Sequence, residues 1–317
     1  MKIAVIGGGT GAPEILRGFE HYLTNQDTLS AIANMVDDGG HTGDMVDRFG
    51  VLPPGDLLRC GLALSRHENG WTRELLLYRF DYGRPHTHSL GNEILAALEK
   101  IGKSLPEGIK YFKELLAIPE NRDLFPITLD KTQVCGTTKT GQELNGQTQL
   151  SYPADPNAVI QNVELRPQAE LYKEAKTALL DSDLIVVAPG DLYGSIIPNF
   201  LVNGMRRALS ETDAKFMYVC NIVTKEGSKN FRVSNFVREI ERYSARKLDR
   251  ILVNSSMPSD DTTSRYHEQG QDVVKNDMEG VERVVSGDYL VEYRNVPGLK
   301  GLLRHDPIKV VRDILKD

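Results

Sequence analysis

The chain opens with Lys2-Ile3-Ala4-Val5-Ile6, which runs directly into Gly7-Gly8-Gly9-Thr10-Gly11-Ala12-Pro13. The apolar run is typical of a buried strand, and Pro13 suits the first turn of a helix, because that turn tolerates a missing N–H. Counted from Gly7, the turn fits the pattern G-x-G-x-x-G/A. The stretch therefore predicts the strand, turn and helix that begin an α/β fold.

The small residues of this turn suggest a ligand. Because the glycines of the stretch Gly8, Gly9, Thr10 and Gly11 have no Cβ atoms, its backbone N–H groups can approach an anion. The helix that starts near Pro13 points its positive end at the same place. A phosphate is the natural occupant. The same residues would also form a tight connection that binds nothing, and the motif alone leaves both alternatives open.

The length and the net charge of the chain restrict the class of protein. The 317 residues include 38 Lys and Arg against 44 Asp and Glu, a net charge of −6 that argues against broad nucleic-acid or anionic-membrane binding. We expect a single α/β domain over residues 1–317, with a homo-oligomer left open. No apolar run approaches the ~20 residues of a membrane span, and the first strand leaves no room for a signal peptide, so we expect a cytoplasmic protein.

The three cysteines give no sign of a disulfide framework or a metal site. Cys60, Cys135 and Cys220 lie far apart, and none belongs to a C-x-x-C pair. We expect all three to be small core residues.

A second candidate loop follows the predicted strand Leu29 to Val36. Its acids, Asp37 and Asp38, precede Gly39-Gly40, a composition that suits a ligand crevice better than a core. They could accept hydrogen bonds from ribose hydroxyls or hold Mg²⁺ with several waters. Either acid could instead cap the next helix.

The third candidate loop ends in Pro53-Pro54-Gly55-Asp56, before an apolar helix over Leu57 to Leu64. The prolines fix the approach of the backbone, so Asp56 could be presented to a ligand or could only cap the helix. Arg48 and Arg59 flank it as partners for an anion or for these acids.

Farther along, Ser89 is a candidate N-cap for a helix over Leu90 to Ile101, which leaves the Asn92 amide one turn inside and able to reach a ligand. His86 and His88 precede it. We interpret this pair as capping and loop residues, since no third histidine is nearby for zinc.

Residues 125–165 differ in composition from the helical segments before them. Runs rich in Val, Thr and Gln, at Thr132 to Thr138 and Gln147 to Tyr152, alternate with Gly141 and Asn145-Gly146. This alternation predicts strands joined by hairpins, and hence a small antiparallel insert beside the main sheet.

The parallel pattern returns after a helix predicted over Leu171 to Leu180. The buried strand Leu184 to Ala188 leads into a fourth loop, in which Gly190 and Asp191 precede Ser195. Ser195 could cap the following helix and also bind a phosphate. A strand over Phe216 to Val223 then delivers Asn221 to the same edge.

Four polar, glycine-bearing loops thus follow apolar strands. In open parallel sheets, ligands bind beyond the carboxyl ends of the strands, so we expect these loops to converge on a nucleotide or phosphorylated ligand, with Mg²⁺ as an optional partner. The fold class is α/β, Rossmann-like and doubly wound, with a mainly parallel sheet and the antiparallel insert.

Several motifs, in this order along the chain, resemble the YvcK-like gluconeogenesis factors, a family that shares a superfamily with CofD, the 2-phospho-L-lactate transferase of deazaflavin biosynthesis. They spread over nearly the whole chain. The motifs are the opening glycine turn, Asp37-Asp38-Gly39-Gly40, Leu52-Pro53-Pro54-Gly55-Asp56, His88-Ser89-Leu90-Gly91-Asn92, Ala188-Pro189-Gly190-Asp191-Leu192-Tyr193 with Ser195-Ile196-Ile197-Pro198-Asn199, and Arg304-His305-Asp306-Pro307.

The resemblance implies a cytoplasmic protein that binds a UDP-sugar, such as UDP-N-acetylglucosamine, and takes part in cell shape during growth on gluconeogenic carbon sources. It also implies that Tyr266 and Arg304 contribute to the sugar-nucleotide site. Arg304 suits a diphosphate because guanidinium groups bind phosphates bidentately. The family leaves it open whether any reaction is catalysed.

The chain departs from the family pattern at His41-Thr42-Gly43-Asp44, where Asp44 replaces a basic residue, and at Arg59-Cys60-Gly61. The alternative function is a Mg²⁺-dependent transferase of the CofD kind, which acts on a nucleotide-diphosphate donor with Asp37, Asp38 and Asp191 as metal ligands. An NAD-dependent oxidoreductase rests on the opening glycine turn alone.

Overall fold

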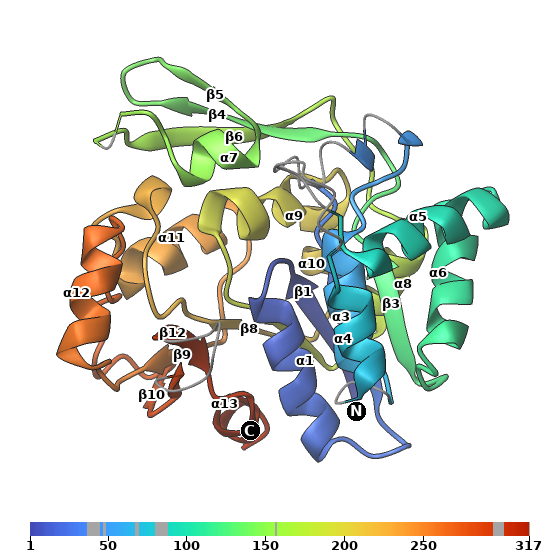
Figure 1. The fold of residues 1–317 in the computed structure, drawn as a ribbon. Helices are drawn as coiled ribbons and strands as arrows, with labels where there is room; N and C mark the ends of the chain where they lie inside the picture. The colour runs from blue at the N-terminus through green and yellow to red at the C-terminus, as the bar shows by residue number, and fades with distance from the viewer. Residues whose placement is uncertain are drawn as a thin grey trace.

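The computed structural model of the chain describes residues 1–36, 45–46, 49–66, 70–79, 88–155, 157–293 and 301–316 (Figure 1). At its centre lies a sheet of seven strands in which every neighbouring pair is parallel. In spatial order the strands are β10 (Val284–Gly287), β9 (Arg250–Asn254), β8 (Lys215–Val219), β7 (Leu184–Val187), β1 (Lys2–Gly7), β2 (Thr28–Ala33) and β3 (Arg122–Pro126). This arrangement confirms the predicted doubly wound α/β fold.

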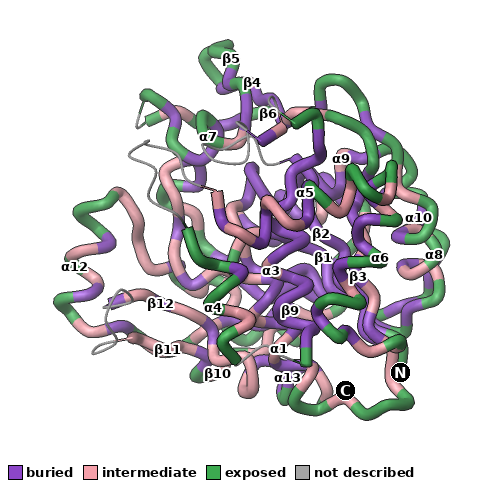
Figure 2. The backbone as a smooth tube through the Cα atoms, turned by 45° about the vertical axis from the view of Figure 1, so that its right-hand side comes forward, coloured by how far each residue is buried: buried purple, intermediate pink, exposed green. Residues whose placement is uncertain are grey.

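The opening apolar run forms the middle of this sheet. Every residue of β1 after Lys2 is buried, and Ile3 pairs with Leu29 of β2 on one side and with Leu184 of β7 on the other. Strands covered on both faces are continuously apolar, which explains why this stretch lacks the alternation of a surface strand. Figure 2 shows the central strands almost entirely in the buried class.

Helices cover both faces of the sheet. One face carries α1 (Gly11–Tyr22), α3 (Gly55–Leu64) and α13 (Pro307–Ile314), and the other carries α8 (Lys173–Asp181), α9 (Ile197–Leu201), α10 (Met205–Glu211) and α11 (Val233–Ser244). Outside α3 lie α4 (Trp71–Leu77), α5 (Leu90–Gly102) and α6 (Leu105–Leu115). The amphipathic pattern of α1 places Ile15, Leu16 and Phe19 in the core.

The predicted antiparallel insert is present. A three-stranded sheet has the order β5 (Glu143–Asn145), β4 (Gln133–Thr138), β6 (Ile160–Arg166), and it lies over the loops that follow β7 and β8 (Figure 1). A Cβ built on Gly194 would lie 2.6 Å from Gln147 Cγ, so the insert and the loop after β7 are in close contact. The strand predicted over Gln147 to Tyr152 is wrong.

That segment is α7 (Gly146–Ser151). Gly146 adopts a φ of +86° and turns the chain into the helix, and Gln149 Oε1 accepts the Asn145 N–H at 2.9 Å. Leu150 is fully buried, with its side chain against Gly136 of β4. Tertiary packing therefore overrides the local strand preference of this polar run.

Other predicted elements differ mainly at their ends. The second strand ends at Ala33 and not at Val36, and the strand expected over Phe216 to Val223 ends at Val219. The sequence did not indicate that Arg122–Pro126 joins the main sheet as its edge strand β3. The helix α12 (Asp260–Glu268) was also not anticipated.

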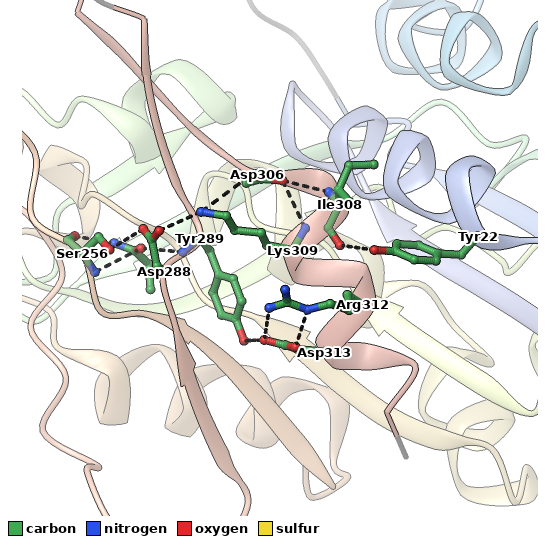
Figure 3. A network of polar contacts seen from close by, with 10 residues as sticks. Tyr22, Ser256, Asp288, Tyr289, Asp306, Ile308, Lys309, Arg312 and Asp313 are labelled. Atoms are coloured by element: carbon green, nitrogen blue, oxygen red, sulfur yellow. Dashed lines mark hydrogen bonds and ion pairs between the residues drawn. The ribbon is translucent and has the colours of Figure 1, made fainter.

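The last part of the chain returns to the sheet. The antiparallel hairpin of β11 (Leu290–Tyr293) and β12 (Leu302–His305) leads into α13, which packs on α1. Figure 3 shows how this helix is fixed: Asp306 accepts the N–H groups of Ile308 and Lys309 at 3.1 Å, and the Tyr289 hydroxyl donates to Asp313 at 3.0 Å. These bonds fix α13 directly after the strand that carries Arg304.

All three cysteines are buried, as predicted for core residues. Burial raises the pKa of the Cys60 thiol and raises that of Cys220 to about 12, so neither is a thiolate at neutral pH. Among the helices in the described part of the chain, none has the length and apolar character that a membrane crossing requires.

Candidate functional site

The strand order contains one reversal, between β1 and β7. From β1 the chain proceeds outward through β2 and β3, and from β7 it proceeds the other way through β8, β9 and β10. The loops that leave the carboxyl ends of β1 and β7 therefore run in opposite directions. Open α/β sheets bind ligands at this kind of position. We call the residues of these two loops, together with Asn34 and Asp56, the switch-point crevice.

The glycine turn after β1 forms the centre of the crevice. Gly9 adopts a φ of +64°, a left-handed conformation that favours glycine. A Cβ on Gly11 would lie 1.8 Å from the Pro189 carbonyl oxygen, and a Cβ on Gly8 would lie 2.0 Å from Asp56 Oδ2. The glycines thus let three segments meet: the first loop, the loop after β7 and the start of α3.

Asp56 lies in the first turn of α3 and is 5% exposed. Its Oδ1 accepts the Gly9 N–H at 2.7 Å and is 3.5 Å from Arg59 Nη1. The N-cap position of α3 belongs to Pro54, so Asp56 does not cap its own helix. The carboxylate instead accepts a hydrogen bond from one of the backbone N–H groups that we had expected to bind a phosphate. Gly55, the first residue of α3, is buried next to it.

The loop after β7 is held from β8. Asn221 donates its amide N–H to the Gly190 carbonyl at 2.5 Å and accepts from the Tyr218 hydroxyl at 2.8 Å. Gly190 lies beside Gly8, with 4.0 Å between its ideal Cβ position and the Gly8 carbonyl oxygen. Asn221 is therefore a positioning residue that fixes Gly190 next to the first loop.

Asp191 follows Gly190 and caps the π-helical turn η1 (Leu192–Ile196). Its Oδ1 accepts the Gly194 N–H at 2.9 Å, and its Oδ2 lies 3.0 Å from Lys225 Nζ. The expectation that Ser195 caps the next helix is wrong. Ser195 lies inside η1, and its hydroxyl accepts the Gln147 amide N–H at 3.2 Å, because Asp191 already takes the capping position.

Two buried amides, Asn34 of the crevice and Asn92 of α5, have unpaired polar atoms. In the described part of the chain, neither Asn34 Nδ2 nor Asn34 Oδ1 has a hydrogen-bond partner, and the same is true of Asn92 Oδ1. Asn34 is 1% exposed and touches the Gly8 position, while Asn92 is 5% exposed in the first turn of α5, behind Ser89 at the N-cap. An unpaired buried polar atom costs about 1–3 kcal/mol, so these amides are candidates for ligand or water contacts.

Next to the crevice lies a pocket of about 570 Å³, which we call the arginine pocket. Thr10, the residue before α1, lines it. Its charged lining residues are Glu14 and Arg17 of α1, Arg59 of α3, Arg73 of α4 and Arg304 of β12. Its volume is in the range of small-molecule sites.

The charges in this pocket do not balance. Glu14 lies 2.9 Å from Arg17, and Asp56 pairs with Arg59, but among the described residues no carboxylate forms an ion pair with Arg73 or Arg304. Burial and the nearby Arg17 lower the pKa of Arg73. Crowded guanidinium groups repel one another, and an anion between them would remove that cost.

The tail positions Arg304. Tyr266 is 9% exposed, and its hydroxyl accepts the Leu303 N–H at 3.1 Å. His305 is buried, its pKa is lowered to about 4 by burial, and its Nε2 donates to the Cys220 carbonyl at 3.0 Å. Both contacts hold β12 in place. Tyr266 therefore packs behind the strand with Ile222 and Leu303, while Arg304 lines the pocket.

The structure thus brings Gly8, Gly9, Gly11, Asp56 and Gly190 together and places Thr10 and Arg304 on the adjoining pocket. Asp37, Asp38, His41, Asp44, Arg48 and His86 lie outside the described residues. The described residues contain no group of three or more His, Cys, Asp or Glu that could hold a metal ion.

The sequence did not indicate Arg17, Arg73 or Asn34. Arg17 and Arg73 are ordinary helical surface positions in the sequence, and only the approach of α1, α4 and β12 reveals them. Asn34 carried a weak signal, since it is a polar residue within the apolar run Leu29 to Val36.

Comparisons with known proteins agree with this architecture. The profile of the family described as 2-phospho-L-lactate transferase CofD matches residues 3–289. A Thermotoga maritima protein named "Putative gluconeogenesis factor" is 35% identical over 98% of this chain and 97% of its own length. The Bacillus subtilis protein named "Gluconeogenesis factor" is 30% identical over 100% of this chain and 98% of its own.

Solved structures show the same fold. A crystal structure of a Bacillus halodurans protein superposes with a TM-score of 0.89 at 28% identity and covers 99% of both chains. Fold, profile and full-length relatives agree, and the chain therefore belongs to the CofD family, within the group of its gluconeogenesis factors.

Proposed function

We propose that this gluconeogenesis factor binds a nucleotide sugar of the UDP-sugar class, with the diphosphate in the arginine pocket and the remainder extending into the switch-point crevice. The observation that carries the proposal is the unbalanced charge of the pocket, in which Arg73 and Arg304 have no carboxylate partner among the described residues. A diphosphate supplies negative groups that guanidinium side chains bind through charge-assisted, often bidentate, hydrogen bonds.

The glycine turn has a different role in this proposal. Asp56 already accepts the Gly9 N–H, and a phosphate in the same place would be repelled by the carboxylate. The turn therefore brings Thr10 and α1 to the edge of the pocket, and the arginines bind the charge. Asn34 and Asn92 offer unpaired amide atoms to the uncharged parts of the ligand.

The resemblance described above supports the wider role. We propose that the protein acts in the cytoplasm and links the supply of a UDP-sugar to cell shape during growth on gluconeogenic carbon sources. In this role, ligand binding serves as a signal and needs no chemical step.

Calorimetric titration with UDP-N-acetylglucosamine tests the binding. We expect binding to the wild-type chain, and we expect Arg304→Gln to weaken it by roughly ten- to hundred-fold, because a charge-assisted hydrogen bond contributes about 1.5–3 kcal/mol. Arg207→Gln is the matched control, since Arg207 is 75% exposed on α10 and, within the described part of the chain, forms its one ion pair with Glu211. No heat of binding at millimolar ligand would reject the proposal.

A second candidate function follows from the family profile, whose description is a transferase. We propose as the alternative that the chain transfers a phospholactyl-type group from a nucleotide-diphosphate carrier to a hydroxyl. Incubation with Mg²⁺, carrier and acceptor, followed by mass spectrometry, should then show a product. If the nucleotide sugar binds and no product forms, binding alone is the function.

A further inference from the structure

We propose that Lys225 supplies the positive charge of the switch-point crevice at Asp191, so that the ligand binds there without a divalent metal. The inference rests on the proposed binding of a nucleotide sugar, which it extends by naming a residue and a metal requirement.

Asp191 does not fit the role of a metal ligand. Its Oδ1 accepts the Gly194 N–H at 2.9 Å, and its buried Oδ2 forms an ion pair with Lys225 Nζ at 3.0 Å but no hydrogen bond among the described residues. The side chain is 6% exposed, which leaves little room for the waters that Mg²⁺ keeps. A cation bound to the same oxygen would also lie within a few ångströms of the ammonium and be repelled by it.

Lys225 is held in place by its surroundings. Its Nζ lies 5.5 Å from the centroid of the Tyr152 ring, which belongs to the end of the antiparallel insert. Its backbone N–H donates to the Ser228 hydroxyl at 3.1 Å, within the short turn η2 (Glu226–Ser228). Burial lowers the pKa of Lys225, but Asp191 and Tyr152 outweigh it and raise the value overall, so the side chain is charged at neutral pH.

This ammonium is adjacent to the crevice. Asp191 follows Gly190, and Gly190 lies beside Gly8 in the first loop. The Lys225 side chain is 37% exposed, and its ammonium has three N–H donors that can reach a ligand beside the ion pair with Asp191. A sugar hydroxyl on the part of the ligand that extends into the crevice can therefore reach the Lys225 ammonium, whose other side faces Asp191.

The experiment is a titration with UDP-N-acetylglucosamine in EDTA and in excess MgCl₂. We expect the wild-type dissociation constant to agree within about two-fold in the two buffers, and Lys225→Met to bind about ten-fold more weakly in EDTA with partial recovery in Mg²⁺, since one charge-assisted contact is lost. Lys225→Arg keeps a cation and should retain independence of Mg²⁺. If Lys225 only formed a structural salt bridge with Asp191, Mg²⁺ would not restore ligand binding to the Lys225→Met variant.

A wild-type affinity that falls about ten-fold or more in EDTA, or a Lys225→Met variant as tight as the wild type in EDTA, would overturn the inference. A second measurement does not depend on the nucleotide sugar: Mn²⁺ binding followed by electron paramagnetic resonance. We expect Asp191→Asn to leave Mn²⁺ binding unchanged, and its loss in that variant would also overturn the inference. If the wild type gives no heat with the nucleotide sugar, the proposed function fails and the Mn²⁺ measurement still decides this point.

Discussion

The switch-point crevice and the arginine pocket are neighbours with opposite electrostatic character. In the crevice each acid has a partner: Asp56 accepts the Gly9 N–H, and Asp191 pairs with Lys225. In the pocket, Arg73 and Arg304 have no such partner among the described residues. A glycine-rich motif can therefore organise a site without itself binding the anion. The charge that selects the ligand comes from helices and a strand that meet the motif in space.

The largest effect should come from the contact that joins the two strand loops of the crevice. Gly11→Ala places a Cβ 1.8 Å from the Pro189 carbonyl oxygen, where only backbone movement can make room. We expect the free energy of unfolding to fall by about 3 kcal/mol or more, measured by urea denaturation. Gly190→Ala is the matched control, because its Cβ meets Ile196 at 3.5 Å, an ordinary contact. Equal losses in both variants would contradict the crowding at Gly11.

The next effect concerns the strand that brings Arg304 to the pocket. The neutral His305 has a lowered pKa of about 4, against about 6.5 in an unfolded chain, so the unfolded state binds more protons between these values. Its contribution to stability is therefore present above pH 6.5 and is lost as the pH falls toward 4. At pH 5 the loss amounts to about 2 kcal/mol.

His305→Gln provides the comparison for this pH dependence, because its amide can still donate to the Cys220 carbonyl but does not titrate. We expect the wild type to lose more stability than this variant between pH 7 and pH 5 in urea denaturation. Parallel pH profiles for the two proteins would show that His305 does not take up the proton.

The smallest expected effect comes from a change at Asp56, which belongs to the crevice and pairs with Arg59 of the arginine pocket. Asp56→Asn keeps an oxygen for the Gly9 N–H but removes the charge that pairs with Arg59. We expect stability to fall by about 1 kcal/mol and the affinity for UDP-N-acetylglucosamine to rise a few-fold, because the pocket becomes more positive. Calorimetry measures the second effect. Weaker binding would mean that Asp56 itself contacts the ligand.

Much of the fold could be predicted because local sequence patterns determine it. The buried strand at Lys2–Gly7, the prolines before α3 and the glycines after the strands each have one favourable structure, and a parallel sheet collects their loops at one edge. Prediction failed where packing decides. The polar run after Asn145 reads as a strand, but its contact with η1 makes it a helix.

The site was less predictable for the same reason. The glycine turn and Asp56 both stood out as candidates, but their hydrogen bond to each other is a contact between residues 47 positions apart. Arg17, Arg73 and Arg304 come from three distant parts of the chain. Nothing in the local sequence distinguishes Arg17 and Arg73 from solvated surface arginines, and Arg304 stood out only through its place in a family motif. The position of a charged side chain relative to others depends on the complete fold.

The most direct measurement is a crystal structure with UDP-N-acetylglucosamine bound. We expect the diphosphate oxygens to lie within hydrogen-bond distance of Arg73 and Arg304, while Asp56 still accepts the Gly9 N–H. Phosphate oxygens bound to the backbone N–H groups of Gly8 to Gly11, with Asp56 displaced from Gly9, would contradict this expectation.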